Sequence, residues 1–320
     1  MKILVIRLSS LGDVLLATPV VRCLKSQIDD CQVHFLTKAS NAALLKDSPY
    51  IDRLILWNGD TRETIRTMVD EEYDYVVDLH NRRRTRYIRR SITGRKLVYK
   101  KESWRKLLYI LTRIDLLHGR HVVDRYMDTL EPLGIRNDGG GLDVFVSKEI
   151  DMTLEKPKGR YVVVACGAQH GTKRIPPERL YELVGMINRE VILVGDEADR
   201  LRIVESGVGF GEGVRNMCGR TKIEELVALI QDADLVITPD SMTMHMAAAL
   251  KRPVVAIWGA TTPKFGFSAY CTTHVDYERE HLWCHPCSRT GFEHCPLGHF
   301  RCMNGHDWRS IAEKVNQIEK

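Results

Sequence analysis

Asp240-Ser241-Met242-Thr243-Met244-His245 forms a polar corner between two apolar runs. The run 234–239 precedes it, and a short helix-like segment, 246–250, leads into a second apolar run at 253–258. This order predicts a βαβ unit whose corner lies at the carboxyl end of a parallel strand. The N–H groups of a helix N-terminus attract anions there. The corner is thus a candidate anion site with Asp240 as acceptor and His245 as cation, and ordinary helix capping is the alternative.

The same alternation of strand and helix runs along the whole chain. The expected strands are 2–8, 32–36, 54–57, 75–79, 142–146, 161–166 and 190–194, besides the two above. The expected helices include 14–25, 61–72, 124–133, 178–187 and one that a capping box, Thr221 to Glu224, opens. Strands that alternate with helices predict parallel sheets covered on both faces. We therefore expect an α/β protein of two Rossmann-like, doubly wound domains that face a cleft.

The expected domain limits follow from breaks in this pattern. The first domain spans 1–150, and a charged segment with one proline, 148–158, is the expected linker. The second domain spans 159–305, and 306–320 is expected to form a C-terminal helix that could pack back on the first domain. A length of 320 residues suits two domains, each with its own core.

Positive charge is concentrated in one segment of the first domain. Twelve Lys and Arg and a single acid, Glu102, lie between Arg82 and Lys106, although the net charge is only +5. Such a patch indicates an anionic partner. Few aromatic residues interleave with the arginines and no RNA-binding motif occurs, so we expect no nucleic acid as partner. Each basic residue could also gain roughly 1 kcal/mol beside anionic lipid head groups.

Several classes of protein are disfavoured by the sequence. No run reaches ~18 apolar residues, and the apolar start is interrupted at Arg7 and Asp13, so a cytoplasmic protein is expected. The glycine run 207–213 does not fit a dinucleotide-binding fingerprint, and no Walker A motif occurs. We therefore expect no bound cofactor.

Three segments together resemble glycosyltransferase family 9, the ADP-heptose:lipopolysaccharide heptosyltransferases. They are 2–19, which contains Ser10-Leu11-Gly12-Asp13, then 167–180, and the opening motif with its extension to Pro263. The resemblance implies a GT-B fold with the acceptor on the first domain and the nucleotide sugar on the second. It also implies inversion at the anomeric carbon without a catalytic metal, at the cytoplasmic face of the inner membrane. The partners would be an ADP-sugar and an anionic lipopolysaccharide-type acceptor.

The resemblance also assigns roles to residues. Asp13 would be the general base, a role that a helix dipole supports by keeping its carboxylate ionised. Lys173 would offset the charge of the departing diphosphate. The implied donor contacts are Thr172, Arg174, Glu197, Asp240, Ser241, Met242 and His245. On the acceptor side we expect Ser10, Gly12, His80, Arg82, Arg83 and Arg84, which follow the ends of two strands. Met242 stands where the family usually has glycine, so the sugar pocket could be reshaped.

The sequence leaves two alternative functions open, and it leaves open the chemical state of four C-terminal cysteines. A nucleotide-sugar epimerase of the same fold would use the donor lobe without a cationic acceptor surface. A non-catalytic protein that binds anionic glycan or nucleic acid would have no reason to keep Asp13, Lys173 and Asp240 in register. Cys284, Cys287, Cys295 and Cys302 could hold a structural metal, form a disulfide or remain thiols.

Overall fold

The computed structural model describes residues 1–146, 157 and 159–318, and the chain divides into two compact units. Unit 1 is Met1–Glu102 with Arg120–Lys148, and unit 2 is Ser103–Gly119 with Glu149–Lys320. The expected linker at 148–158 falls almost wholly outside the described residues.

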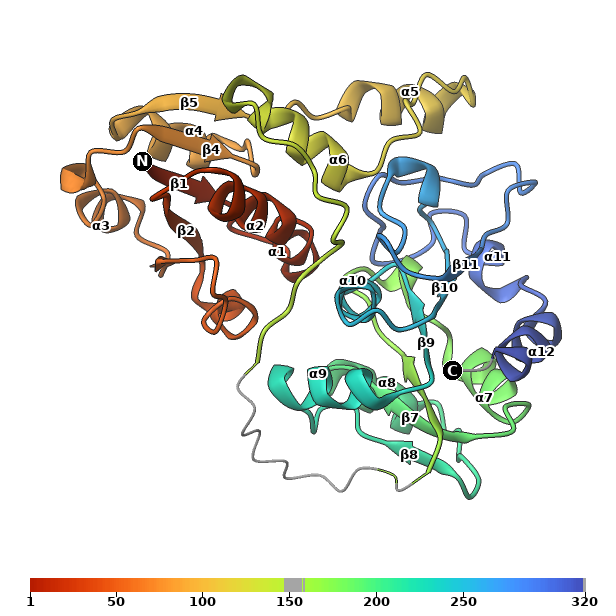
Figure 1. Cartoon of the computed structure of the whole chain (residues 1–320). Helices are drawn as coiled ribbons and strands as arrows, with labels where there is room; N and C mark the ends of the chain where they lie inside the picture. The colour runs from red at the N-terminus through yellow and green to blue at the C-terminus, as the bar shows by residue number, and fades with distance from the viewer. Residues whose placement is uncertain (147–156, 158, 319–320) are drawn as a thin grey trace. The chain divides into compact units, whose positions relative to one another are not determined.

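Unit 1 is built on a parallel sheet of five strands in the order β3-β2-β1-β4-β5 (Figure 1). The strands are β1 (Lys2–Ile6), β2 (Gln32–Lys38), β3 (Arg53–Trp57), β4 (Tyr75–Asp78) and β5 (Arg95–Val98). The helices are α1 (Leu11–Leu15), α2 (Thr18–Gln27), η1 (Ala39–Leu44), α3 (Thr61–Arg66), η2 (Val69–Glu71), α4 (Arg83–Ser91), α6 (Val122–Met127) and η3 (Asp128–Leu133). The apolar run 3–6 is fully buried as the central strand, because a parallel strand is covered on both faces.

Unit 2 contains a six-stranded parallel sheet in the order β11-β10-β9-β6-β7-β8. The strands are β6 (Tyr161–Ala165), β7 (Glu190–Val194), β8 (Val214–Asn216), β9 (Leu235–Pro239), β10 (Val254–Ile257) and β11 (His274–Tyr277). The helices are α5 (Ser103–Thr112), η4 (Gly171–Lys173), α7 (Pro177–Val184), α8 (Glu197–Glu205), α9 (Ile223–Asp232), α10 (Met242–Ala249), η5 (Pro263–Phe265), α11 (Arg301–Asn304) and α12 (Trp308–Gln317).

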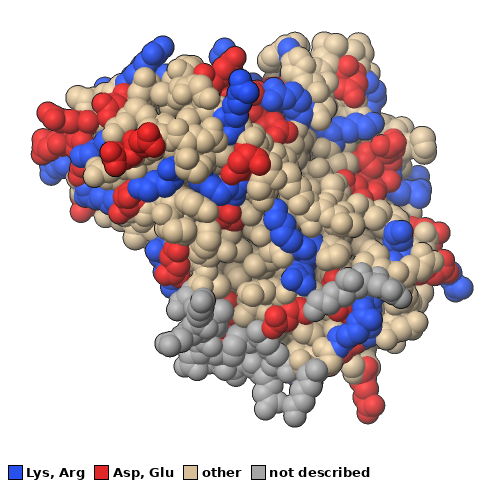
Figure 2. Space-filling model, viewed as in Figure 1, with Lys and Arg blue, Asp and Glu red and all other residues tan. Residues whose placement is uncertain are grey.

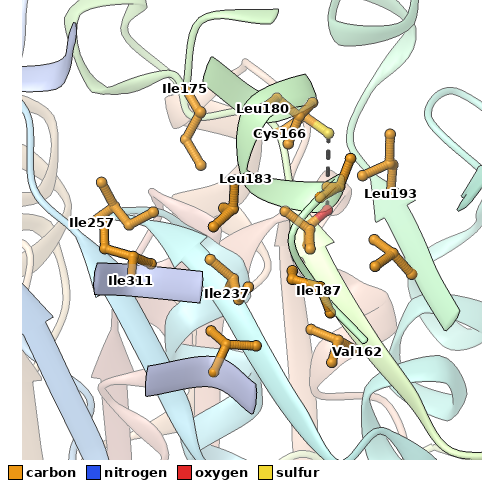
Figure 3. Packing of buried hydrophobic residues seen from close by; sticks show 14 of the residues in the cluster. Val162, Cys166, Ile175, Leu180, Leu183, Ile187, Leu193, Ile237, Ile257 and Ile311 are labelled. Carbon is orange, nitrogen blue, oxygen red and sulfur yellow. Dashed lines mark hydrogen bonds between the residues drawn. The ribbon is translucent and has the colours of Figure 1, made fainter. Parts of the chain in front are cut away.

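The core of unit 2 joins the sheet to α7 and α12. Figure 3 shows Leu180 and Leu183 of α7 among branched residues of the strands, with Ile311 of α12 in the same cluster. The expected C-terminal helix is present as α12, and its apolar stripe is buried beside α7 in the core of unit 2.

Two local expectations are wrong, and one strand was not expected. Segment 142–146 is not a strand, because Asp143 pairs with Arg22 on α2 and its N–H donates to Thr18 Oγ1 at 2.9 Å. The fifth strand is β5 instead, inside the basic segment. The expected capping box is displaced by one residue, since the N–H of Lys222 donates to Glu225 Oε2 at 2.9 Å.

Segment 103–119 also departs from the expected limits, because it belongs to unit 2 although it precedes the last part of unit 1 in the sequence.

Candidate functional site

In each sheet the strand order reverses once, between two neighbouring strands. Many of the expected site residues lie in loops after the carboxyl ends of those strands. In unit 1 the chain places β2 on one side of β1 and β4 on the other. In unit 2 it places β7 on one side of β6 and β9 on the other. Ligands of open α/β sheets bind beyond the carboxyl ends of the strands at such points.

Asp13 lies beyond the end of β1, and one of its oxygens takes three contacts. Oδ2 accepts from the N–H of Ser10 at 3.0 Å and from Ser10 Oγ at 2.9 Å, and it lies 2.6 Å from Nη2 of Arg7. Burial would raise the pKa of Asp13, but the charge of Arg7 and the bonds from Ser10 outweigh it and lower that pKa. Asp13 is thus held ionised, as a general base must be, while it also caps α1.

Arg7 is the partner of Asp13 that sequence reasoning missed. Its Nη1 donates to the carbonyl of Leu79, beyond β4, at 2.7 Å, and its guanidinium lies 5.6 Å from the centre of the Tyr126 ring. The available signal was a charged residue at the end of the apolar run that forms the central strand.

His80 and Lys101 share the electrostatic environment of Asp13. Burial, with the charges of Arg7 and Lys101, lowers the pKa of His80 to about 4, so this imidazole is neutral at pH 7 and cannot bind an anion as a cation. Burial and the charges of Arg82 and Arg7 lower the pKa of Lys101 to about 8. Lys101, which we did not single out from the sequence, is therefore a cation that titrates close to neutral pH.

The basic segment is divided among several elements. Its first part makes α4, its middle makes β5, and its end enters α5 of unit 2. Arg82, Arg83 and Arg84 are all exposed at the start of α4, and Arg84 also lies over the ring of Trp57, with 4.2 Å between Cζ and the ring centre. The charge of Arg82 contributes to the lowered pKa of Lys101.

In unit 2 an ion pair joins the two loops at the reversal point. Lys173, in η4 after β6, places Nζ 2.7 Å from Oδ2 of Asp240, which follows β9. Thr261 Oγ1 donates to the same oxygen at 2.8 Å. Both charged side chains are only 13% exposed, so the pair is well shielded from solvent. Thr261 is a further residue that the sequence did not single out.

Thr172 holds the loop that carries Lys173. Its N–H donates to the carbonyl of Phe292 at 2.9 Å, and its hydroxyl accepts from the N–H of Phe292 at 2.8 Å. Its own carbonyl accepts from Ala260 at 3.2 Å, and a Cβ on Gly259 would lie 2.3 Å from that oxygen. Thr172, which we expected to contact the donor, is therefore buried, and its hydroxyl is hydrogen-bonded to the backbone of Phe292 in the neighbouring loop.

The other expected donor contacts lie along the same edge of the sheet. Ser241 precedes α10 and shares a 3.0 Å hydrogen bond with Thr238, and Met242 begins that helix. His245 is buried one turn into α10. Arg174 Nε donates to the carbonyl of Ala168 at 2.9 Å.

Two neighbouring acids after β7 have different surroundings. Asp196 caps α8 by accepting the N–H of Asp199 at 2.9 Å, so its carboxylate has a structural task. Glu197 is exposed and pairs with Arg200 at 2.5 Å. Both acids are exposed, and each is engaged, Asp196 by the N–H of Asp199 and Glu197 by the guanidinium of Arg200.

The four C-terminal cysteines line one cavity together with His285 and His299. Cys284 Sγ lies 3.7 Å from Nε2 of His299. The cysteines are free thiols, and nowhere in the described residues do three suitable side chains surround a metal position. The same loop contacts the donor-side loop, because Cys287 donates its N–H to the carbonyl of Ala260 at 3.1 Å.

Comparisons with known proteins show the family and the fold of the chain. Residues 61–295 match the model of glycosyltransferase family 9 (heptosyltransferase). The chain is 26% identical over 283 residues to lipopolysaccharide heptosyltransferase 3 of Escherichia coli K12, covering 79% of this chain and 81% of that protein. These matches confirm the resemblance read from the sequence.

Two solved structures have the same fold. The E. coli ADP-heptose lipopolysaccharide heptosyltransferase II has a TM-score of 0.72 at 20% identity, covering 99% of this chain and 98% of that one. E. coli WaaC with ADP-2-deoxy-2-fluoro heptose has a TM-score of 0.69 at 18% identity, covering 99% of each chain. The predicted fold of two Rossmann-like domains is confirmed.

Proposed function

The chain belongs to glycosyltransferase family 9, the heptosyltransferases, and from this we propose that it transfers a heptose from ADP-heptose to a lipopolysaccharide-type acceptor. One observation carries the proposal: an ionised carboxylate lies at the reversal point of one sheet, and a shielded Lys173–Asp240 pair lies at that of the other. The first suits proton removal, and the second suits a charged donor.

We assign the donor to unit 2. Lys173 would leave Asp240 in part to meet the diphosphate, and the N–H groups at the start of α10 would add positive potential there. Asp240, still held by Thr261, is then placed to accept hydroxyl groups of the sugar or ribose. Glu197 is suited to the ribose.

We assign proton removal to Asp13 in unit 1. The acceptor oxygen attacks the anomeric carbon as the bond to the diphosphate breaks, the proton passes to Asp13, and ADP departs with its charge offset by Lys173. Direct displacement inverts the anomeric configuration and uses no metal in this scheme. Arg82 and Lys101 would bind phosphate groups of the acceptor. A lipid-linked acceptor would place the reaction at the cytoplasmic face of the inner membrane.

The test is turnover with ADP-heptose and a lipid-free, phosphorylated core oligosaccharide, followed by mass spectrometry. We expect ADP and a product one heptose heavier, formed with inversion by NMR and unaffected by a chelator. Asp13→Asn should reduce turnover ~10²–10⁴-fold with ADP affinity unchanged. The control is Asp70→Asn, which removes an exposed carboxylate of the same unit. Equal turnover in Asp13→Asn and wild type would refute the assignment of the base.

A further inference from the structure

Helix α5 packs on unit 2 through a buried lysine and leaves several apolar side chains exposed, which is the opposite of an ordinary surface helix. Lys106 is the one buried residue of α5. Its Nζ donates to the carbonyl of Phe265 at 2.9 Å and lies 4.5 Å from the centre of the Phe267 ring. A surface helix normally buries its apolar stripe and exposes its charges.

The attached face of α5 is a stripe of residues at i, i+3 and i+7. Next to Lys106, the ring of Tyr109 meets that of Phe265 edge-on, with centres 6.3 Å apart. Beyond the helix end, Arg113 donates to the carbonyls of Pro286 and Trp283, each at 3.0 Å. Polar groups therefore help to fix the orientation of α5, while Trp104, Leu107 and Leu111 of the same helix stay exposed.

The outward face of α5 carries Trp104, Leu107 and Leu111 at i, i+3 and i+7, and Ile114 follows just beyond the end of the helix. The exposed fractions are 60% for Trp104, 46% for Leu107, 72% for Leu111 and 56% for Ile114. Trp283, whose carbonyl accepts a hydrogen bond from Arg113, is 72% exposed. We call these five residues the α5 surface. In Figure 2 the part of the molecule over α5 is mostly uncharged.

Charge accompanies this apolar surface. Segment 103–119 contains three basic residues, Arg105, Lys106 and Arg113, and one acid, Asp115, which gives a net charge of +2. The guanidinium of Arg105 lies 5.2 Å from the centre of the Trp104 ring. Arg113 donates to carbonyls of Tyr109, Ile110, Pro286 and Trp283, which carry no net charge. Exposed leucine with interfacial tryptophan and flanking cations is typical of a helix that lies in a lipid headgroup layer.

We infer that the α5 surface docks unit 2 onto an anionic lipid bilayer, with α5 in the plane of the interface. No helix in the described part of the chain is long and apolar enough to cross a membrane. The inference rests on the proposed function in one respect: an acceptor anchored in the bilayer gives the enzyme a reason to bind there. The apolar stripe supplies the contact, and the cations select anionic lipid.

The test is co-sedimentation of the full chain with vesicles of phosphatidylethanolamine and phosphatidylglycerol, without donor or acceptor. The double variant Leu107→Gln/Leu111→Gln should bind on the order of tenfold less, because two exposed leucines no longer enter the interface. The matched control is Leu201→Gln/Val204→Gln on α8, where the exposed fractions are 45% and 61%. This control should bind as wild type. Neutral phosphatidylcholine vesicles and high salt should weaken binding of the wild type.

Further readouts separate this inference from the proposed function. Vesicles with brominated acyl chains should quench fluorescence, and Trp104→Phe should remove part of that quenching. Turnover with the lipid-free acceptor should be unchanged in the α5 double variant, so that its loss would point to a folding defect. Equal vesicle binding by both double variants would overturn the inference. So would sedimentation showing that the wild type self-associates through this face and binds no vesicles.

Discussion

Nη2 of Arg7 lies 2.6 Å from Oδ2 of Asp13, while Nη1 of the same guanidinium reaches the carbonyl of Leu79 at 2.7 Å. One side chain therefore ties the ends of β1 and β4 together at the reversal point of the sheet. It also keeps the pKa of Asp13 low in spite of burial.

The first prediction concerns the charge of Arg7. Arg7→Gln removes the cation that lowers the pKa of Asp13, so that pKa should rise, and the acidic limb of the pH profile of kcat/KM should move to higher pH. Arg7→Lys keeps a charge and should move the limb less. The measurement is kcat/KM from pH 4 to 8, with a thermal melt of each variant. An unmoved limb in Arg7→Gln would mean that Asp13 is not the titrating base.

The second prediction separates the partners of the ion pair in unit 2. Lys173→Met removes a phosphate contact and should weaken ADP binding about tenfold or more, which is roughly 1.4 kcal/mol. Asp240→Asn releases Lys173 from its partner, so ADP affinity should hold or rise while turnover of the sugar donor falls. Calorimetry with ADP and steady-state kinetics would measure both. ADP binding that weakens in Asp240→Asn as much as in Lys173→Met would contradict these roles.

The third prediction is a pH dependence set by Lys101. Its pKa of about 8 means that the cation is lost as pH rises through 8, so KM for a phosphorylated acceptor should increase there while kcat holds. Lys101→Arg stays charged and should flatten the rise. Because the folded protein binds fewer protons than the unfolded chain between pH 8 and the usual 10.5, the contribution of Lys101 to the free energy of unfolding should increase with pH in that window.

The fourth prediction compares two arginines that look equivalent in the sequence. Arg82→Gln should raise KM for the acceptor several-fold and reduce its salt dependence, because Arg82 acts beside Lys101. Arg84→Gln loses a contact with Trp57 worth about 0.5–2 kcal/mol and should lower Tm more than it changes KM. Kinetics at two salt concentrations and thermal melts would distinguish them. A larger change in KM for Arg84→Gln would show that the acceptor lies over Trp57 instead.

Most of the fold could be predicted from the sequence, because buried parallel strands are continuous apolar runs and the helices between them are amphipathic. β5 was hidden because it contains Arg95 and Lys96, and Leu97 alone is buried in it. Segment 142–146 has the composition of a strand, but the pairing of Asp143 with Arg22, over a hundred residues away, holds it beside α2. Distant partners of this kind leave no local pattern.

The site could be predicted only in part for the same reason. Asp13, Lys173 and Asp240 belong to short motifs that follow apolar runs, and the resemblance of those motifs to the family singles them out as candidates. Thr261 donates to Asp240, and the pKa of Lys101 is lowered by burial and by the charges of Arg82 and Arg7. Both residues matter through surroundings that only the folded chain provides. Thr172 is the opposite case: the motif points to a donor contact, whereas in the structure its hydroxyl accepts the N–H of Phe292 and so ties two loops together.

The discontinuity of unit 2 has a consequence for protein engineering. A chimaera joined to a relative near residue 150 would carry the relative's counterpart of α5 onto a foreign surface at Phe265 and Phe267. A fragment that begins there would lack the helix and leave two aromatic side chains uncovered. Exchange of unit 1 between relatives should therefore succeed only when segment 103–119 stays with unit 2.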